Sequence, residues 1–359
     1  MRITADFVGG NIVAAQTDEN RFLLSCDLRG GPEWFYWAFC AEGAKAGQTC
    51  TFSFDGDRVG NFGPAVSHDL QHWAWAKGEH TPRSFSYTFS EGEDRVYFAH
   101  HFLYHPARFD ALCRELALPV SRLTASEKGR NVPCLQLGQD GKTVLLTARH
   151  HACESTGNYV LEGFLREWAQ HPIPGLSLVC VPFVDYDGVV DGDQGKGRPP
   201  FDHNRDYDPA APSRYAAVRA IRQLAKARDV RYAIDFHSPW HCGGENDTVF
   251  IPQKHYDILP DLRRFSLLLE QVCGADCFPH LSSDDVPPDT GWNRVGTPCF
   301  GTYMHATAGA ALAFTLETAY FVSHGVPFSA QNAIATGRAV CRALAAFDKA
   351  HTDPTINPL

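Results

Sequence analysis

The sequence predicts an α/β domain, in which helices flank a β-sheet, preceded by an antiparallel β-sandwich. The N-terminal part consists of short alternating segments separated by Gly, Asp and Asn turns, a pattern typical of antiparallel sheets. After about Tyr104, uninterrupted apolar runs alternate with helical patterns, which indicates strands covered by helices. We therefore expect a β-sandwich domain over residues 1–104 and a second domain over residues 105–359.

Aromatic residues at every second position mark the strands of the predicted sandwich. The alternation is clearest over residues 51–54 and 85–89, where one face of each strand would be apolar. The densest aromatic cluster is EWFYW at residues 33–37. We interpret this cluster as core of the sandwich, and the alternative is a platform for a sugar or a peptide.

The second domain combines strand and helix patterns. Apolar residues recur on one helical face over residues 160–168 and again over residues 218–225, where Ser213 is the expected N-cap. The stretch 185–212 is rich in Gly, Pro and Asp, and we expect a long functional or exposed loop there. Three apolar runs that read as strands are residues 143–147, 176–181 and 230–236.

Composition excludes several classes of protein. The 359 residues carry a formal net charge of −9 and contain no Lys/Arg run of the kind that binds nucleic acid. No segment approaches the roughly 18 to 20 apolar residues of a membrane span, and the first residues do not resemble a signal peptide. The twelve cysteines are scattered and include no C-x-x-C pair. We expect a cytoplasmic protein with reduced thiols that binds neither nucleic acid nor membranes.

His151 and Glu154 are the first residues that indicate chemistry. They stand three positions apart, directly after the apolar run 143–147 and before a helical pattern. The carboxyl end of such a strand is where α/β sheets bind ligands. Imidazole nitrogen and carboxylate oxygen both bind Zn²⁺ at about 2 Å, so one turn can offer two ligands to the same ion.

A polar side chain also ends the run 230–236 and a fourth apolar run near the C-terminus. His237 follows the run 230–236, and Glu317 ends the run that begins at Leu312. His237 can complete a set of two histidines and one glutamate, which in catalytic zinc sites leaves a position for water. Glu317 is either a surface charge on an edge strand or, beside such a metal, a general base.

Arg205 is a candidate for binding a carboxylate. It lies in the loop sequence FDHNRDY, next to Asn204, and its guanidinium can hold a carboxylate through two parallel hydrogen bonds. The alternative is a surface arginine that pairs with a neighbouring aspartate.

In this order, the motifs resemble the zinc carboxypeptidase family, and in particular its cytosolic carboxypeptidase branch. The motifs are A-R-x-H-x-x-E-S, D-x-N-R, D-x-H and T-L-E, together with FVGGN and WFY in the N-terminal part. The resemblance implies a mixed eight-stranded sheet flanked by helices from about residue 105. It also implies one zinc ion per chain and the following roles: His151, Glu154 and His237 as its ligands, Asn204 and Arg205 as binders of the substrate's terminal carboxylate, and Glu317 as general base.

The resemblance leaves three residues to be assigned by position. An arginine that polarises the scissile carbonyl is expected before the Asn-Arg pair, and Arg198 is our candidate, with Lys196 as the alternative. A tyrosine that closes over the substrate corresponds to Tyr303. Members that remove acidic residues carry a basic residue in the stretch that here spans 295–317 and contains no Lys or Arg, although Arg294 lies just outside it.

The implied function is that of a zinc metallocarboxypeptidase, which hydrolyses the C-terminal peptide or isopeptide bond of a peptide or protein. The first alternative is a zinc-dependent deacylase or amidase on the related fold. The second is a catalytically inactive protein that binds peptides.

Overall fold

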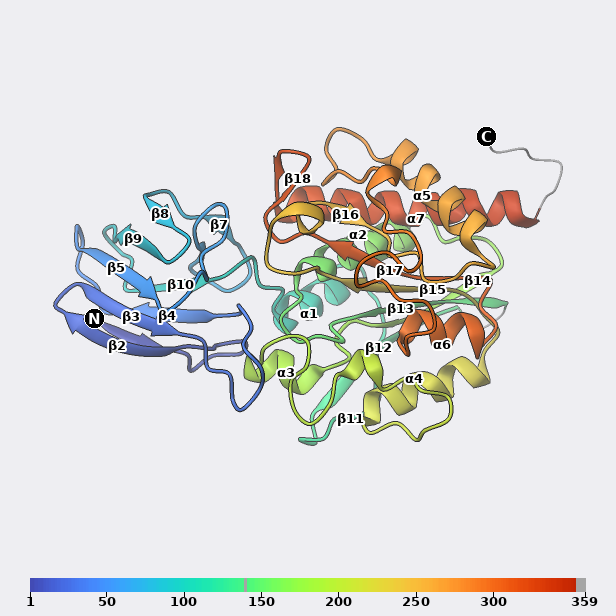
Figure 1. The fold of residues 1–359 in the computed structure, drawn as a ribbon, viewed down its shortest axis with the longest axis horizontal. Coiled ribbons are helices and arrows are strands. Elements are labelled where there is room, and N and C mark those ends of the chain that lie inside the picture. Colours follow the sequence, from blue (N-terminus) through green and yellow to red (C-terminus); the bar gives the residue numbers. More distant parts are fainter. Residues whose placement is uncertain (139–140, 353–359) are drawn as a thin grey trace.

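The computed structural model describes residues 1–138 and 141–352, so residues 353–359 of the predicted second domain lie outside the described part. Two bodies are visible in Figure 1. One consists of the N-terminal strands, and the other of a central sheet with helices on both sides.

The N-terminal body is a sandwich of two five-stranded sheets. Neighbouring strands are antiparallel except for β3 and β5, which are parallel. The predicted alternating segments form β5 and β9, which pair with each other. One sheet has the order β1 (Arg2–Thr4), β4 (Ala38–Glu42), β10 (Arg95–Ala99), β6 (Ala65–Ser67) and β7 (Ala74–Trp75). The other has the order β2 (Val13–Asp18), β3 (Arg21–Ser25), β5 (Thr49–Phe54), β9 (Ser84–Thr88) and β8 (His80–Thr81).

The second body is built on a mixed sheet of seven strands within the described residues, against the eight that the resemblance implies. The three central pairs, β14–β13, β13–β15 and β15–β17, are parallel, and the outer pairs are antiparallel. The predicted apolar runs are β13, β14, β15 and β17. The order is β11 (Val120–Ala125), β12 (Asn131–Leu137), β14 (Leu176–Val181), β13 (Lys142–Ala148), β15 (Val230–His237), β17 (Leu312–Thr318) and β16 (Val249–Phe250).

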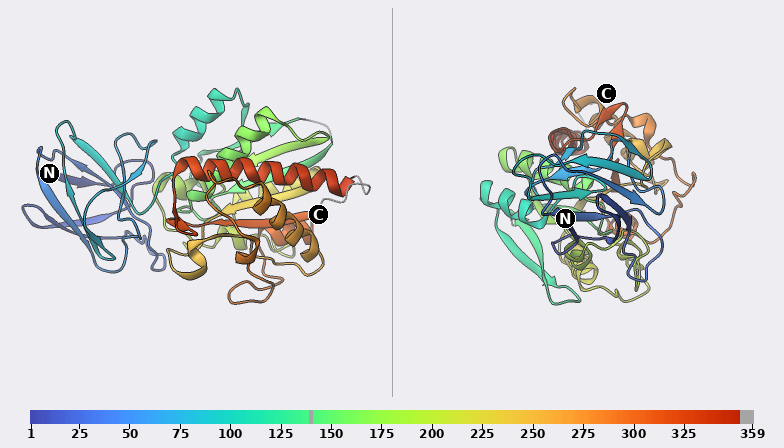
Figure 2. Two further views of the ribbon diagram at one scale, coloured as in Figure 1. Left: turned by 90° about the horizontal axis from the view of Figure 1, so that it is seen from above. Right: turned by 90° about the vertical axis from the view of Figure 1, so that its left-hand side faces the viewer.

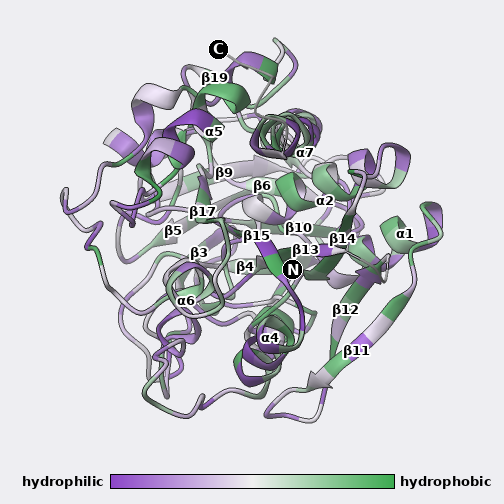
Figure 3. Ribbon diagram, turned by 90° about the vertical axis from the view of Figure 1, so that its right-hand side faces the viewer, coloured by the Kyte–Doolittle hydropathy of each residue, from purple (hydrophilic) through white to green (hydrophobic). Residues whose placement is uncertain are grey.

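Helices cover both faces of this sheet, as Figures 2 and 3 show. Alternate strand residues point to opposite faces: Val144 and Leu146 pack with one group of helices and Leu145 with the other. The first group is α1 (Pro106–Glu115), α2 (Thr156–Gln170), α5 (Leu259–Val272) and α7 (Ala330–Thr352). The second is α4 (Ala216–Ala227) and α6 (Phe300–Ala306). The shorter elements are α3 (Tyr186–Asp191), η1 (His203–Arg205), η2 (Gly244–Asp247), η3 (Ser282–Asp284), β18 (Val322–Ser323) and β19 (Val326–Pro327).

The start of α4 differs from the prediction. Ser213 is not the N-cap, because the helix begins at Ala216 and Tyr215 occupies the cap position. The backbone N–H groups of Arg214 and Tyr215 donate to the carboxylate of Asp206. These bonds fix the chain that leads into α4, and the first N–H of the helix, that of Ala216, donates to the carboxylate of Glu127 at 2.7 Å.

The helices α2 and α7 pack against each other through glycines. A Cβ added to Gly337 would lie 1.8 Å from the carbonyl oxygen of Val160, and one added to Gly163 would lie 2.0 Å from that of Ile334. We expect Gly337→Ala to force the helices apart and to lower the free energy of unfolding by about 1–3 kcal/mol or more. Urea denaturation measures this effect. Gly301→Ala is the control, because its Cβ would meet ordinary contacts of 3.7 Å in α6; equal midpoints for the two variants would contradict the prediction.

Candidate active site

The carboxyl edge of the central sheet brings His237 and Glu317 together. These residues are directly paired in the parallel strands β15 and β17. Since paired residues of neighbouring strands point to the same face, both side chains emerge on one side of the sheet. Both line a cavity at that edge.

His151 and Glu154 lie in the turn between β13 and α2. Arg149, the first residue after β13, has a left-handed backbone with φ of 60°, which redirects the chain as it leaves the sheet. Its buried guanidinium donates through Nε to the carbonyl oxygen of Ala152 at 2.7 Å. The turn is closed by the Glu154 N–H, which donates to the carbonyl of His151 at 3.2 Å.

The carboxylate of Glu154 lies between the two histidines. Its Oε1 is 2.7 Å from Nδ1 of His151, and its Oε2 is 2.7 Å from Nδ1 of His237. The other ring nitrogens face carboxylates: Nε2 of His151 is 3.2 Å from Asp202, and Nε2 of His237 is 2.6 Å from Asp235. Ligand atoms of His151, Glu154 and His237 lie within 4.8 Å of one another. Carboxylates behind metal-binding histidines orient the rings and raise their basicity.

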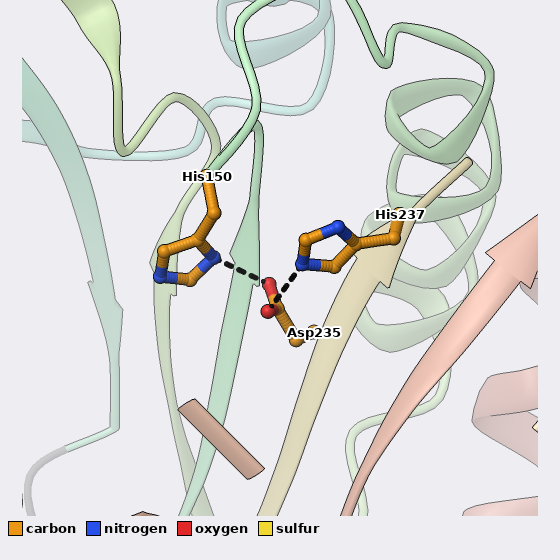
Figure 4. A group of neighbouring side chains, drawn as sticks. All are labelled: His150, Asp235 and His237. Atoms are coloured by element: carbon orange, nitrogen blue, oxygen red, sulfur yellow. Dashed lines mark hydrogen bonds and ion pairs between the residues drawn. The ribbon is translucent and has the colours of Figure 1, made fainter. Parts of the chain in front are cut away.

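A second candidate group shares His237 and consists of His150, Asp235 and His237 (Figure 4). Asp235 lies between the two imidazoles and also accepts from the hydroxyl of Thr147. The far nitrogen of His150 contacts the hydroxyl of Tyr207 at 2.8 Å. His150 and Asp235 are buried and do not line the cavity. Of the two groups, only His151, Glu154 and His237 all face the space that a substrate can enter.

The charges of this site depend on one another. Burial alone would lower the pKa of His151, but the carboxylates of Glu154 and Asp202 outweigh it and raise that pKa to about 9. Burial alone would raise the pKa of Glu154, but His151 and His237 lower it to about 2. The result is a carboxylate between two protonated imidazoles. A divalent cation fits this donor set, because it would replace the protons that now hold the groups together.

Binding of Zn²⁺ should therefore be linked to proton release. With the pKa of His151 at about 9, a proton competes with the ion below that pH, so we expect affinity to rise as the pH approaches about 9. Each displaced proton should contribute up to about tenfold in affinity per pH unit. Calorimetric titration in buffers of different ionisation enthalpy counts the protons. Binding without proton release, and with an affinity independent of pH, would contradict the prediction.

Glu317 differs from the other carboxylates. It is 8% exposed, and its Oε2 has no hydrogen-bond partner among the described residues. Burial raises the pKa of Glu317 to about 7. A carboxyl group with such a pKa can take up and release a proton near neutral pH.

The cavity has a volume of about 330 Å³. Its lining includes Asn204 and Arg205, which belong to η1, and Nδ2 of Asn204 lies 3.3 Å from Nε2 of His237. Arg205 donates to the carbonyl of Pro298 at 3.4 Å. Asn204 accepts from the backbone N–H of Phe300 at 3.0 Å, which joins η1 to the start of α6.

Arg198 and Tyr303, assigned from the sequence, do not line this cavity. The guanidinium of Arg198 pairs with the carboxylates of Asp185 and Asp193, whereas Lys196, the alternative, is among the lining residues. Tyr303 packs between α6 and the sheet and is 2% exposed.

Arg294 also lies outside the cavity lining. Its guanidinium donates to the carbonyl of Asp289 at 3.1 Å.

The sequence interpretation missed several lining residues. Trp34 belongs to the cluster that we interpreted as sandwich core, but its ring meets that of Trp240 edge to face at 4.6 Å beside the cavity. Lys254 and Trp292 line it too, with the ammonium 5.3 Å from the ring centre. No local pattern marks Trp240, Lys254 or Trp292, whereas for Trp34 the platform alternative of the EWFYW cluster was available.

The two carboxylates that contact the far nitrogens of the histidines could have been found from the sequence, because each belongs to one of the motifs. Asp202 is the first residue of the D-x-N-R motif, and Asp235 is the first residue of the D-x-H motif.

The chain is similar to known proteins in sequence and in fold. No protein-family model matches the chain. It is 23% identical over 255 residues to the uncharacterized protein ZMO1242 of Zymomonas mobilis, covering 66% of this chain and 67% of that protein. It is 26% identical over 185 residues to cytosolic carboxypeptidase 2 of Xenopus tropicalis, covering 43% and 19%. It is 23% identical over 295 residues to cytosolic carboxypeptidase 6 of mouse, covering 72% and 53%. The chain thus spans about half, or less, of the length of these two carboxypeptidases.

Solved structures match over almost the whole chain. A metallo-carboxypeptidase from Burkholderia cenocepacia has a TM-score of 0.78 at 19% identity, covering 98% of this chain and 99% of that one. The chain has the metallo-carboxypeptidase fold. A metallo-carboxypeptidase from Pseudomonas aeruginosa, solved with (2-guanidinoethylmercapto)succinic acid, matches with a TM-score of 0.78 at 20% identity, over 97% and 99%. These matches confirm the fold predicted from the sequence, a mixed sheet flanked by helices and preceded by a β-sandwich.

No helix in residues 1–138 and 141–352 is long and apolar enough to cross a membrane.

Proposed function

We propose that this chain is a zinc-dependent metallocarboxypeptidase that hydrolyses the C-terminal peptide or isopeptide bond of a peptide or protein. One observation carries the proposal. The carboxyl group of Glu317, whose Oε2 has no hydrogen-bond partner among the described residues, shares a cavity with the His151–Glu154–His237 group and with Arg205. A possible base, a possible metal site and a possible carboxylate binder therefore face the same space.

His151, Glu154 and His237 would hold one zinc ion. Two imidazoles and one carboxylate form a donor set that catalytic zinc sites use. Zinc bound there would lower the pKa of a water molecule and polarise the substrate carbonyl. Asp202 and Asp235 would keep the two rings in orientation through their far nitrogens.

Glu317 would move the proton. It would take a proton from the attacking water and then give that proton to the leaving amine, which ends as a free amino group. Its raised pKa, about 7, supports both steps at neutral pH. Lys196, which lines the same cavity, would donate to the carbonyl oxygen as negative charge develops on it.

Arg205 and Asn204 would select the end of a chain. A free α-carboxylate can receive two parallel hydrogen bonds from the Arg205 guanidinium. The hydrogen bond of that guanidinium to the carbonyl of Pro298 is long, at 3.4 Å, and a carboxylate could replace it. Holding that carboxylate fixes the terminal amide bond beside Glu317. The two carboxypeptidases among the relatives are named cytosolic, which supports our prediction of a cytoplasmic location.

Matched peptides with a free and an amidated C-terminus test this function. We expect the zinc-loaded protein to release the last residue only from the free form. Arg205→Ala should lower kcat/KM for it about 10- to 100-fold, since a hydrogen bond to a charged group contributes about 1.5–3 kcal/mol. Arg294→Ala, which removes an arginine outside the cavity, is the control. Cleavage of the amidated peptide, unaffected by Arg205→Ala, would point to a deacylase or amidase; binding without turnover would point to an inactive peptide-binding protein.

A further inference from the structure

A third group of possible metal ligands lies outside the cavity lining. His255 and Asp257 follow β16 in the chain, and His305 is near the end of α6. One ligand atom from each lies within 4.8 Å of those of the other two. These three residues have no role in the proposed hydrolysis.

The hydrogen bonds of His305 leave its Nε2 able to bind a cation. Nδ1 is 3.1 Å from the carbonyl oxygen of Ala310, and because a carbonyl only accepts, Nδ1 must carry the hydrogen. Nε2 then faces Oδ2 of Asp257 at 2.8 Å, and either a proton or a metal ion must separate the two. A backbone carbonyl behind the ring is a common partner of metal-binding histidines.

His255 provides a second, independent observation. Its side chain is buried, with the residue 8% exposed, yet its Nε2 has no hydrogen-bond partner among the described residues. Its ring centre is 4.7 Å from that of His305. A proton between His305 and Asp257 would satisfy that pair but would leave His255 without a partner.

We propose that His255, Asp257 and His305 form a second site for a divalent cation of the zinc class, separate from the catalytic cavity. Two imidazoles and one carboxylate suit Zn²⁺ better than Mg²⁺ or Ca²⁺, which prefer oxygen ligands. The carboxylate of Asp257 is 71% exposed, so water can complete the coordination.

An ion at this second site would connect two segments that contribute to the cavity lining, the one after β16 and the one that contacts α6. Lys254, which lines the cavity, is next to His255 in the chain. At the other end of α6, Phe300 donates its N–H to Asn204, which also lines the cavity. A bound ion would therefore hold the segment after β16 against α6 and restrain both walls.

Equilibrium dialysis against Zn²⁺, with the metal counted by mass spectrometry, tests the second site. We expect two ions per chain in the wild type and one in Asp257→Asn, whose exposed position does not endanger folding. His255→Gln should also bind one. His324→Gln is the matched control and should keep two, because His324 pairs with Asp284 but belongs to no group of three ligands among the described residues.

Glu154→Gln separates this proposal from the catalytic one. It should retain one ion, and the double variant with Asp257→Asn should retain none. Suppose that the wild type binds one ion, that Asp257→Asn loses it and that Glu154→Gln keeps it. This result would support the second site and contradict the catalytic one. Metal content unchanged from wild type in both Asp257→Asn and His255→Gln would overturn the second site.

Discussion

Glu317→Gln is expected to lower kcat by about 10²- to 10⁴-fold, the usual contribution of a general acid–base group, while the zinc content stays that of the wild type. The amide has nearly the shape of the carboxyl group but cannot accept the proton of the attacking water. Glu317 lies at the cavity without belonging to the His151–Glu154–His237 group, so its replacement should remove proton transfer alone. Initial rates on a peptide with a free C-terminus, together with metal analysis, measure the two quantities.

Glu245→Gln is the control for this substitution. Glu245 lines the same cavity, but its carboxylate accepts a hydrogen bond from the indole N–H of Trp292 at 2.8 Å. We expect a change in kcat of no more than a few-fold, since a neutral amide can keep that hydrogen bond. If Glu317→Gln retained wild-type turnover, Glu317 could not be the base.

Glu154→Gln should remove one zinc ion per chain and reduce hydrolysis to background. The two oxygens of Glu154 each face an imidazole nitrogen at 2.7 Å; a neutral amide would leave the cation with two neutral imidazoles and no negative ligand. Metal analysis after dialysis and the peptide assay measure the two losses.

The same variant discriminates between the two groups that share His237. Glu154 does not belong to the His150–Asp235–His237 group, so an ion held there would survive the substitution. His150→Gln should show the reverse behaviour and keep the ion that supports hydrolysis. Retained metal and activity in Glu154→Gln would therefore move the catalytic site to the buried group.

Much of the fold and the centre of the site could be predicted because both follow from local pattern and strand direction. Four apolar runs identified the inner strands of the central sheet. Parallel strands end at a common edge, so His151 after β13, His237 at the end of β15 and Glu317 near the end of β17 had to approach one another. This expectation does not depend on how many residues separate the three side chains in the sequence.

The remaining features depend on contacts that no local pattern encodes. Lys196 and Arg198 are two residues apart in a loop without periodicity, and the ion pair of Arg198 with Asp185 decides which of them faces the cavity. Tyr303 lies on a short helix whose rotation is set by packing of α6 on the sheet. The parallel pairing of β3 with β5 likewise joins strands that are not consecutive in the chain.

Trp34 connects the N-terminal body to the cavity of the second body. Its indole comes from the N-terminal body and lies beside Trp240 in the lining of a cavity whose other side chains belong to the second body. Severing the chain near Tyr104 would consequently remove this aromatic side chain together with His101, whose Nε2 contacts the carbonyl of Cys153 at 3.0 Å and the hydroxyl of Ser155 at 2.8 Å in the turn that carries Glu154. The second body alone would therefore lack one aromatic wall of the cavity and part of the support of the turn that carries His151 and Glu154.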